Sequence, residues 1–292
     1  MTSAEGQPPL REVRTCRTMT AELVRLAAWL QAAGCTPVAM ESTGVYWRPV
    51  YNLLEPLFIL LGVKAQHINA GPGRKTAVKD AEWIAELLRH GLLRGGFMPA
   101  KPQRQRRELT RHRATLVQDR ARVINRVPAV CAEANIKLAS VVTDIRGVSA
   151  RALREALIAG PQDVAALADL ARGRLRPKRA RLEAALPGAF TPHHSVLLTE
   201  YFSQMDYLDA AIDRVSEVIA QSLAAEQEAI ALLDTMPGVS QRTAEILPAE
   251  SGTDMTRFPR AKHLASWAGL CPGNYDSGGK RLSGKPRKGS RW

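Results

Sequence analysis

Hydrophobic and polar residues alternate with two different periods along the first hundred positions. Residues 19–34 carry apolar side chains at helical spacing, which predicts an amphipathic helix. The apolar run Pro37 to Met40 then predicts a short buried strand with Glu41 at its C-terminal edge. A second helical pattern (45–55), a second apolar run (58–69), a glycine-rich loop and a third helix follow. This alternation of strand and helix predicts an α/β domain with a mostly parallel or mixed sheet.

The middle of the chain has the pattern of long helices. Residues 101–126 contain nine Lys or Arg and two acids, and apolar residues recur among them at roughly heptad spacing, which predicts a coiled-coil-like helix with a basic outer face. Pro128 is expected to kink or end this helix. A second long helix is predicted from His193 to about Leu233. Between them, residues 173–188 are typical of a basic linker with helical pieces; a solvated helix face is the other interpretation of such charge runs.

The C-terminal part is predicted to be mainly helical and to begin with a hairpin of two helices. The turn Pro237–Ser240 resembles a helix-hairpin-helix, in which loop amides and the next helix N-terminus face a phosphate. An ordinary helical corner is equally compatible. After Asp276 the chain has six Lys or Arg, several Gly and Ser, and no acid. Such a segment suits close approach to a nucleic-acid backbone, although a disordered basic tail fits the same composition.

The excess of basic over acidic residues indicates which kind of molecule the protein binds. The 292 residues include 41 Lys and Arg against 28 Asp and Glu, a formal net charge of +13, which favours a polyanionic partner such as nucleic acid. No apolar run is long enough for a membrane span and no signal sequence opens the chain, so no membrane partner is expected. The four cysteines are scattered without metal-type spacing, which predicts reduced thiols and a cytoplasmic protein.

Two acids stand where a metal site could form. Cleavage of a phosphodiester by two Mg²⁺ ions needs three or four carboxylates that converge, because hard cations take oxygen ligands. In a ribonuclease-H-like fold these acids come from strand ends and from a helix beside the sheet. Glu41, at a strand end, and Asp80, at a helix start, fit two of these positions. Taken singly, each is also typical of a surface or capping acid.

Four stretches in the same order carry a resemblance to a known family: AMESTGVYWRPVYNLLE, PGRKTAVKDAEWIAELLRHGLL, NIKLASVVTDIRGVSARALREALIAG, and LLDTMPGVSQRTAEIL with the segment from RFPRAKHLASW to the end. From about Arg14 onward the chain resembles the insertion sequence 110 family of DEDD transposases. The resemblance implies an incomplete ribonuclease-H/RuvC-like domain over 1–100, a basic coiled-coil region over 101–228 and a C-terminal transposase domain over 229–292. It also implies Mg²⁺, DNA ends and target, a structured guide RNA, and a homo-oligomer, either a dimer or a tetramer.

Motif by motif, the resemblance assigns a partial set of catalytic residues. The family glutamate corresponds to Glu41, and its paired aspartates, one helical turn apart, correspond to Ala77 and Asp80. The nucleophilic serine corresponds to Ser277 in YDSGGK. The chain is expected to begin after the strand with the family's first aspartate and to stop before a further helix. The expected nucleic-acid-binding residues are Arg104, Arg107, Arg111, Lys280, Arg281, Lys285, Arg287 and Lys288.

Three functions remain open at this point. The first is an RNA-guided DNA transposase or recombinase, active or formerly active. The second is a catalytically inactive remnant that still binds nucleic acid through its basic regions. The third is a nuclease of the Holliday-junction-resolvase type, which needs a full acidic set and no serine, so that Ala77 argues against it.

Overall fold

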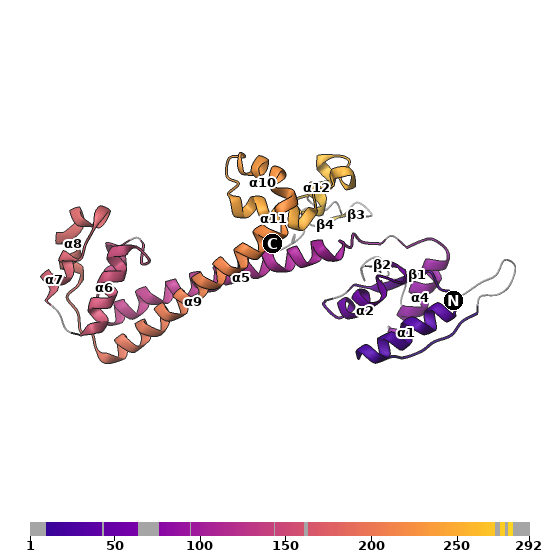
Figure 1. The fold of residues 1–292 in the computed structure, drawn as a ribbon, viewed down its shortest axis with the longest axis horizontal. Coiled ribbons are helices and arrows are strands. Elements are labelled where there is room, and N and C mark those ends of the chain that lie inside the picture. Colours follow the sequence, from indigo (N-terminus) through magenta and orange to yellow (C-terminus); the bar gives the residue numbers. More distant parts are fainter. Residues whose placement is uncertain are drawn as a thin grey trace. The chain divides into compact units, whose positions relative to one another are not determined.

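The computed structural model describes residues 10–42, 44–63, 76–93, 95–142, 144–160, 163–271, 275–277 and 280–282. The chain separates into two compact units, Met1–Lys101 and Pro102–Trp292. Each unit is built around its own buried residues, and each is described by itself below (Figure 1).

Unit 1 is a small α/β arrangement. Its elements are α1 (Thr20–Ala32), β1 (Pro37–Glu41), α2 (Trp47–Leu54), β2 (Ile59–Val63) and α4 (Ala77–Arg89). The two strands pair in parallel, with Pro37 opposite Ile59 and Glu41 opposite Val63. The predicted alternation of helix and strand and the parallel pairing are confirmed.

The buried residues of unit 1 fix where α4 lies. Val63 of β2 and Ile84 of α4 form a small buried cluster, and the half-buried Ala39 of β1 packs against them. Because Ile84 lies one turn after Asp80, this packing turns the first turns of α4 toward β1. The carboxyl end of β1 and the amino end of α4 are thereby brought to the same side of the sheet.

Unit 2 contains two long helices, α5 (Lys101–Glu133) and α9 (Pro192–Ser222), which lie side by side (Figure 1). They run in opposite directions. At one end the Ala189 N–H, just before α9, donates to the Ala134 carbonyl, 2.8 Å away and just after α5. At the other end Arg106 of α5 pairs with Glu226, which follows α9. Apolar residues of both helices contribute to one large buried cluster, and Ile219 of α9 with Leu109 of α5 belongs to a second, smaller one.

Both long helices differ from the predicted boundaries. Helix α5 contains Pro128 and continues to Glu133, so of the two expected effects of the proline, a kink or a helix end, the helix end is wrong. The missing N–H removes one backbone hydrogen bond, and the buried side chains of Val127, Val130 and Cys131 hold the helix in place through it. Helix α9 ends at Ser222 rather than Leu233, because the short η3 (Ala224–Glu226) interrupts it before α10.

The end of unit 2 remote from Glu226 is a helical cap over the same buried cluster. Its elements are η1 (Leu138–Ser140), α6 (Val148–Ala159), α7 (Val164–Asp169), η2 (Gly173–Lys178) and α8 (Arg179–Ala185). The predicted basic linker with helical pieces is confirmed as η2 followed by α8.

The C-terminal part of unit 2 begins with the helical hairpin predicted from the sequence. Helices α10 (Gln227–Asp234) and α11 (Gln241–Ser251) pack against each other, and Gly238 adopts a φ of +85° in the turn between them. A residue without Cβ suits this conformation. The later elements are η4 (Met255–Arg257), α12 (Ala261–Trp267), β3 (Tyr275–Ser277) and β4 (Lys280–Leu282).

Candidate functional site

Glu41 lies at the carboxyl end of β1. The strand ladder extends one residue beyond it, because the Ser42 N–H and hydroxyl both donate to the Val63 carbonyl, at 2.9 Å and 3.2 Å. Glu41 itself is half-buried. Ligands of parallel α/β sheets bind outside the carboxyl ends of the strands, so this position is suited to contact a substrate or an ion.

Asp80 comes from the first turn of α4. The Thr76 hydroxyl caps the helix by accepting the Lys79 N–H at 3.3 Å, and the Asp80 N–H donates to the Thr76 carbonyl at 2.9 Å. A carboxylate in the first turn is favoured by the positive end of the helix dipole. Asp80 therefore has a local structural reason for its position as well as a chemical one. Ala77 is the first residue of the same helix.

These two elements enclose one cavity. Its volume is about 910 Å³, and Glu41, Ala77 and Asp80 all line it, together with apolar side chains of β1 and α4. The structure thus brings the two sequence-predicted acids to a common space. It also places Ala77 on the wall of that space, where the resemblance expects a further carboxylate.

The acids present fit one Mg²⁺ ion better than two. Within the described ranges there is no group of three or more His, Cys, Asp or Glu positioned to hold a metal. Mg²⁺ keeps several waters and is commonly bound by one or two carboxylates plus substrate phosphates. Glu41 and Asp80 match that donor set. They do not supply the three or four acids that a two-ion site requires.

Ser277 lies in the other unit, at the end of strand β3. Strands β3 and β4 pair antiparallel, with Ser277 opposite Lys280 and Asp276 opposite Arg281. The predicted nucleophile and the predicted phosphate-binding Lys280 therefore occupy paired positions of this ladder. The remaining basic residues predicted for this segment, Lys285, Arg287 and Lys288, lie outside the described residues.

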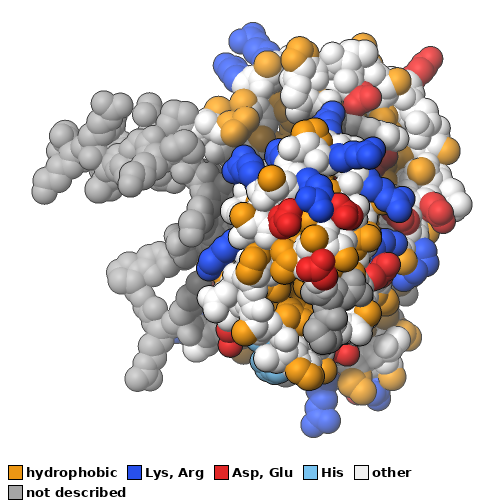
Figure 2. All heavy atoms as spheres, turned by 90° about the vertical axis from the view of Figure 1, so that its left-hand side faces the viewer, with side chains coloured by type: hydrophobic (Ala, Val, Ile, Leu, Met, Phe, Trp, Pro, Cys, Tyr) orange, Lys and Arg blue, Asp and Glu red, His pale blue; other side chains and the backbone are white. Residues whose placement is uncertain are grey.

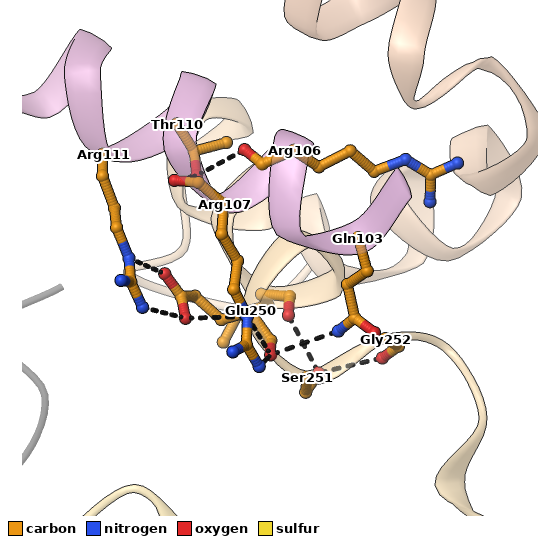
Figure 3. A network of polar contacts seen from close by, with 9 residues as sticks. Gln103, Arg106, Arg107, Thr110, Arg111, Glu250, Ser251 and Gly252 are labelled. Carbon is orange, nitrogen blue, oxygen red and sulfur yellow. Dashed lines mark hydrogen bonds and ion pairs between the residues drawn. The ribbon is translucent and has the colours of Figure 1, made fainter. Parts of the chain in front are cut away.

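Two of the arginines predicted to bind nucleic acid contact Glu250 of α11 (Figure 3). Arg111 forms a bidentate pair with the Glu250 carboxylate, with N–O distances of 2.7 Å and 2.8 Å. Arg107 contacts the same carboxylate at 3.4 Å and donates to the Glu250 carbonyl through Nε at 3.1 Å. The Gln103 amide donates to that carbonyl at 3.3 Å. This side of α5 therefore holds the C-terminal end of α11.

A second buried pair joins the same helices. Arg113 is 4% exposed and pairs with Glu245, which is 8% exposed.

Burial lowers the pKa of the Arg107 guanidinium in the neighbouring contact, and the Glu250 charge opposes that shift. Sequence reasoning missed both glutamates as structural partners. The available signal was two acids five residues apart in a short helix, opposite a helix rich in arginine.

Comparison with known proteins gives three matches. Residues 2–136, a range that includes Glu41, Ala77 and Asp80, match the family model for the IS110-type DEDD transposase. Residues 230–292, which include Ser277, match the model described as the transposase IS116/IS110/IS902 family. A curated relative, the insertion element IS110 uncharacterized 43.6 kDa protein of Streptomyces coelicolor, is 48% identical over 62 residues, or 20% of this chain and 15% of that protein.

The two regions matched by the family models follow the same order as the stretches that carried the resemblance. The part of the chain aligned with the curated relative spans less than two thirds of that protein. None of the helices in the described ranges combines the length and hydropathy needed to cross a membrane. The two family models, one over each end of the sequence, identify this chain as a member of the IS110 family of transposases.

Proposed function

We propose that this chain is a DNA transposase of an insertion sequence, which binds the element ends and a target and takes part in strand transfer between them. The observation that carries the proposal is the cavity lined by both Glu41 and Asp80, in a chain whose two ends match transposase models. The order of strands and helices in unit 1 supports a RuvC-like domain, because the two acids come from a strand end and an adjacent helix start.

In this proposal Glu41 and Asp80 hold Mg²⁺ and align the DNA backbone. The ion, when bound, supplies positive charge at a phosphate oxygen. The helix cap formed by Thr76 fixes the main chain at Asp80, and the pairing of β1 with β2 fixes the main chain at Glu41. Ala77 contributes no oxygen, so we expect weak metal binding until a phosphate adds its own ligands.

Ser277 is proposed as the nucleophile. Its hydroxyl oxygen attacks the phosphorus of a DNA phosphodiester and loses its proton as a serine–phosphate bond forms. The bond to the deoxyribose oxygen breaks, and that oxygen takes up one proton, so that the number of protons is unchanged. Serine is a weak nucleophile unless its proton is removed or the developing charge is stabilised. Lys280, opposite Ser277 in the β3–β4 ladder, and Arg281 are proposed for the second task.

The partners follow from the family resemblance and from charge. We propose that a structured guide RNA and the DNA both contact the basic C-terminal segment, through Lys280, Arg281, Lys285, Arg287 and Lys288. Arg104 of α5 remains a proposed contact. Arg107 and Arg111, predicted from the sequence as contacts, both pair with Glu250, with which a phosphate would have to compete, so we propose that they hold the fold together and leave the nucleic-acid contact to other cations. A dimer or tetramer would bring catalytic domains of different subunits together.

A second candidate function is nucleic-acid binding without catalysis. Ala77 favours it, because a wall of the Glu41–Asp80 cavity lacks a carboxylate at the position where the family resemblance expects one. A resolvase-type nuclease is less favoured for the same reason, since it depends on the acidic site alone.

A recombination assay separates these functions. Cells would carry the matching element ends, target and element RNA, with the chain as it stands or with Ala77→Asp, Glu41→Gln, Ser277→Ala or the control Glu82→Gln. Glu82 lies two residues from Asp80 and does not line the cavity. We expect Ala77→Asp to raise product formation, Glu41→Gln and Ser277→Ala to abolish it, and Glu82→Gln to leave it unchanged.

The outcomes assign the function as follows. Strand-transfer products that depend on both Glu41 and Ser277 support the transposase. No product in any version, including Ala77→Asp, together with retained DNA binding supports the binding protein. Cleavage that survives Ser277→Ala without a covalent protein–DNA adduct would support the nuclease and overturn the serine mechanism.

A further inference from the structure

Among the described residues of unit 2, positive charge is dense in residues 172–181, RGRLRPKRAR, called here the basic segment. It covers η2 and the start of α8 at the helical cap. Six of its ten residues are Lys or Arg and none is acidic: Arg172, Arg174, Arg176, Lys178, Arg179 and Arg181. Figure 2 looks onto this end of the unit and shows several Lys and Arg side chains across the face, with apolar and some acidic side chains between them.

Most of the cations in this segment have no carboxylate partner in the described structure. Among the described residues, Arg179 pairs with Asp169 and Glu183. No ion pair with a described carboxylate joins the other five cations of the segment. In α5, by contrast, six of the nine cations predicted to form a basic face pair with carboxylates of the described chain: Arg106, Arg107, Arg111, Arg113, Arg120 and Arg122.

The backbone of the segment is held firmly in spite of its charge. The Arg172 N–H donates to the Ser149 hydroxyl at 2.8 Å, and this hydroxyl donates to the Arg172 carbonyl at 3.3 Å. Leu175 packs against the large buried cluster. Pro177 restricts the main chain within η2. Like charges fixed close together repel each other, so a rigid cationic segment is favourable chiefly when an anion binds to it.

The same segment lines a recess. A cavity of about 770 Å³ is bounded by Arg172, Arg174 and Lys178 on one side and by the first residues of α6 on the other. One acid, Asp144, also lines the cavity, and its Oδ1 accepts the Arg146 N–H at 2.9 Å. Three cations against one carboxylate leave the recess with an excess of positive charge.

We propose that the basic segment binds the phosphate backbone of a nucleic acid, with residues other than Ser277 and other than those that line the Glu41–Asp80 cavity. The identity of the partner rests on the proposed function, since a transposase must hold nucleic acid over more than its catalytic residues. The chemistry is that of phosphodiester oxygens contacted by guanidinium and ammonium groups. A nucleic acid carries such groups at short, regular intervals along each strand, which suits a row of cations better than a single anion does.

Titration of binding against salt tests this surface. A segment variant would carry Arg172→Ala, Arg174→Ala, Arg176→Ala and Lys178→Ala, which keep the main-chain contacts with Ser149. A matched control would lose the same charge from four exposed cations elsewhere in the chain: Arg17→Ala, Lys137→Ala, Arg214→Ala and Lys262→Ala. Affinity for a 30-base-pair DNA duplex and for an RNA hairpin of similar charge would be measured on the full chain at several salt concentrations.

The segment variant is expected to bind at least about tenfold more weakly at low salt. The slope of log affinity against log salt should fall by about 3 for the duplex, because each lost phosphate contact removes roughly 0.9. The control should change the slope by less than about 1. A charge-preserving variant that carries Arg172→Lys, Arg174→Lys and Arg176→Lys should bind within about threefold of the original chain. A larger loss for one nucleic acid identifies that one as the ligand.

Equal affinities and slopes for the segment variant and the control would overturn the proposal. So would an original chain that binds neither nucleic acid at about 50 mM salt. Loss of binding to vesicles of anionic phospholipid, with nucleic-acid binding unchanged, would make the surface a membrane contact instead. The result is independent of catalysis, because a chain that forms no strand-transfer product can still show the segment-dependent slope.

Discussion

Two regions of unit 2, the first half of α5 and residues 172–181, are both rich in Lys and Arg, but their cations have different structural roles. The arginines in the first half of α5 contact the buried carboxylates of Glu245 and Glu250 in α11, and the carboxylate of Glu226, which follows α9. They thereby hold these parts of unit 2 together. The cations of residues 172–181 lie at the surface, and within the described structure Arg179 alone among them has a carboxylate partner. A run of Lys and Arg therefore does not by itself locate a nucleic-acid site. The carboxylates available elsewhere in the fold decide whether the cations remain accessible.

Loss of the Glu245 carboxylate should produce the largest effect on stability. Glu245→Ala leaves the Arg113 guanidinium buried without its partner, which typically costs about 3–5 kcal/mol. Urea denaturation of the full chain measures the free energy of unfolding. Glu217→Ala, on the exposed side of α9, serves as control and should change it by less than about 0.5 kcal/mol. A loss below about 1 kcal/mol for Glu245→Ala would show that the pair does not hold α11.

Removal of the Glu250 side chain should have a smaller effect. Glu250→Ala removes the carboxylate that Arg107 and Arg111 contact, but the Glu250 carbonyl still accepts from Arg107 and Gln103. These arginines are also more exposed than Arg113, so a loss of about 2–3 kcal/mol is expected. A double-mutant cycle with Arg111→Ala isolates the pair. A coupling energy near zero would contradict the assignment of Arg111 to this contact.

Neutralising the basic segment should hardly change stability. The four substitutions that weaken nucleic-acid binding remove side chains with no carboxylate partner in the described structure, so the free energy of unfolding should shift by less than about 1 kcal/mol in either direction. Thermal melting and urea denaturation both report it. A loss above about 2 kcal/mol would mean that these cations stabilise the fold in the way that the α5 arginines do, and the contrast between the regions would fail.

The smallest effect is expected at an exposed pair on α5 itself. Arg122 and Asp119 stand three residues apart on the solvent side, where a pair contributes about 0.2–0.5 kcal/mol. Asp119→Asn should therefore lower stability by no more than that, as measured in the same urea titrations. An effect as large as that of Glu250→Ala would show that position on the helix, rather than burial of the partner, sets the energy.

Much of the fold, and the positions of the two acids within it, could be predicted from local sequence patterns. The period of apolar residues predicted the strands of unit 1 and a mostly parallel or mixed sheet, of which the structure shows a parallel pair. Chain order placed Glu41 at a strand end and Asp80 at a helix start. The course of α5 through Pro128 could not be predicted, because it depends on burial of Val127 and Val130 against distant helices. Pairing of Arg111 with Glu250 was equally inaccessible, since 139 positions separate the two residues.

Arginine modification with and without nucleic acid tests the contrast between the two regions most directly. The full chain would be treated with phenylglyoxal, alone and with the 30-base-pair duplex, and each arginine followed by mass spectrometry of peptides. The account predicts that Arg172, Arg174 and Arg176 react readily in the free protein and are protected by the duplex. Arg107, Arg111 and Arg113 should react slowly in both states. Protection at the α5 arginines, with residues 172–181 equally reactive in both states, would contradict it.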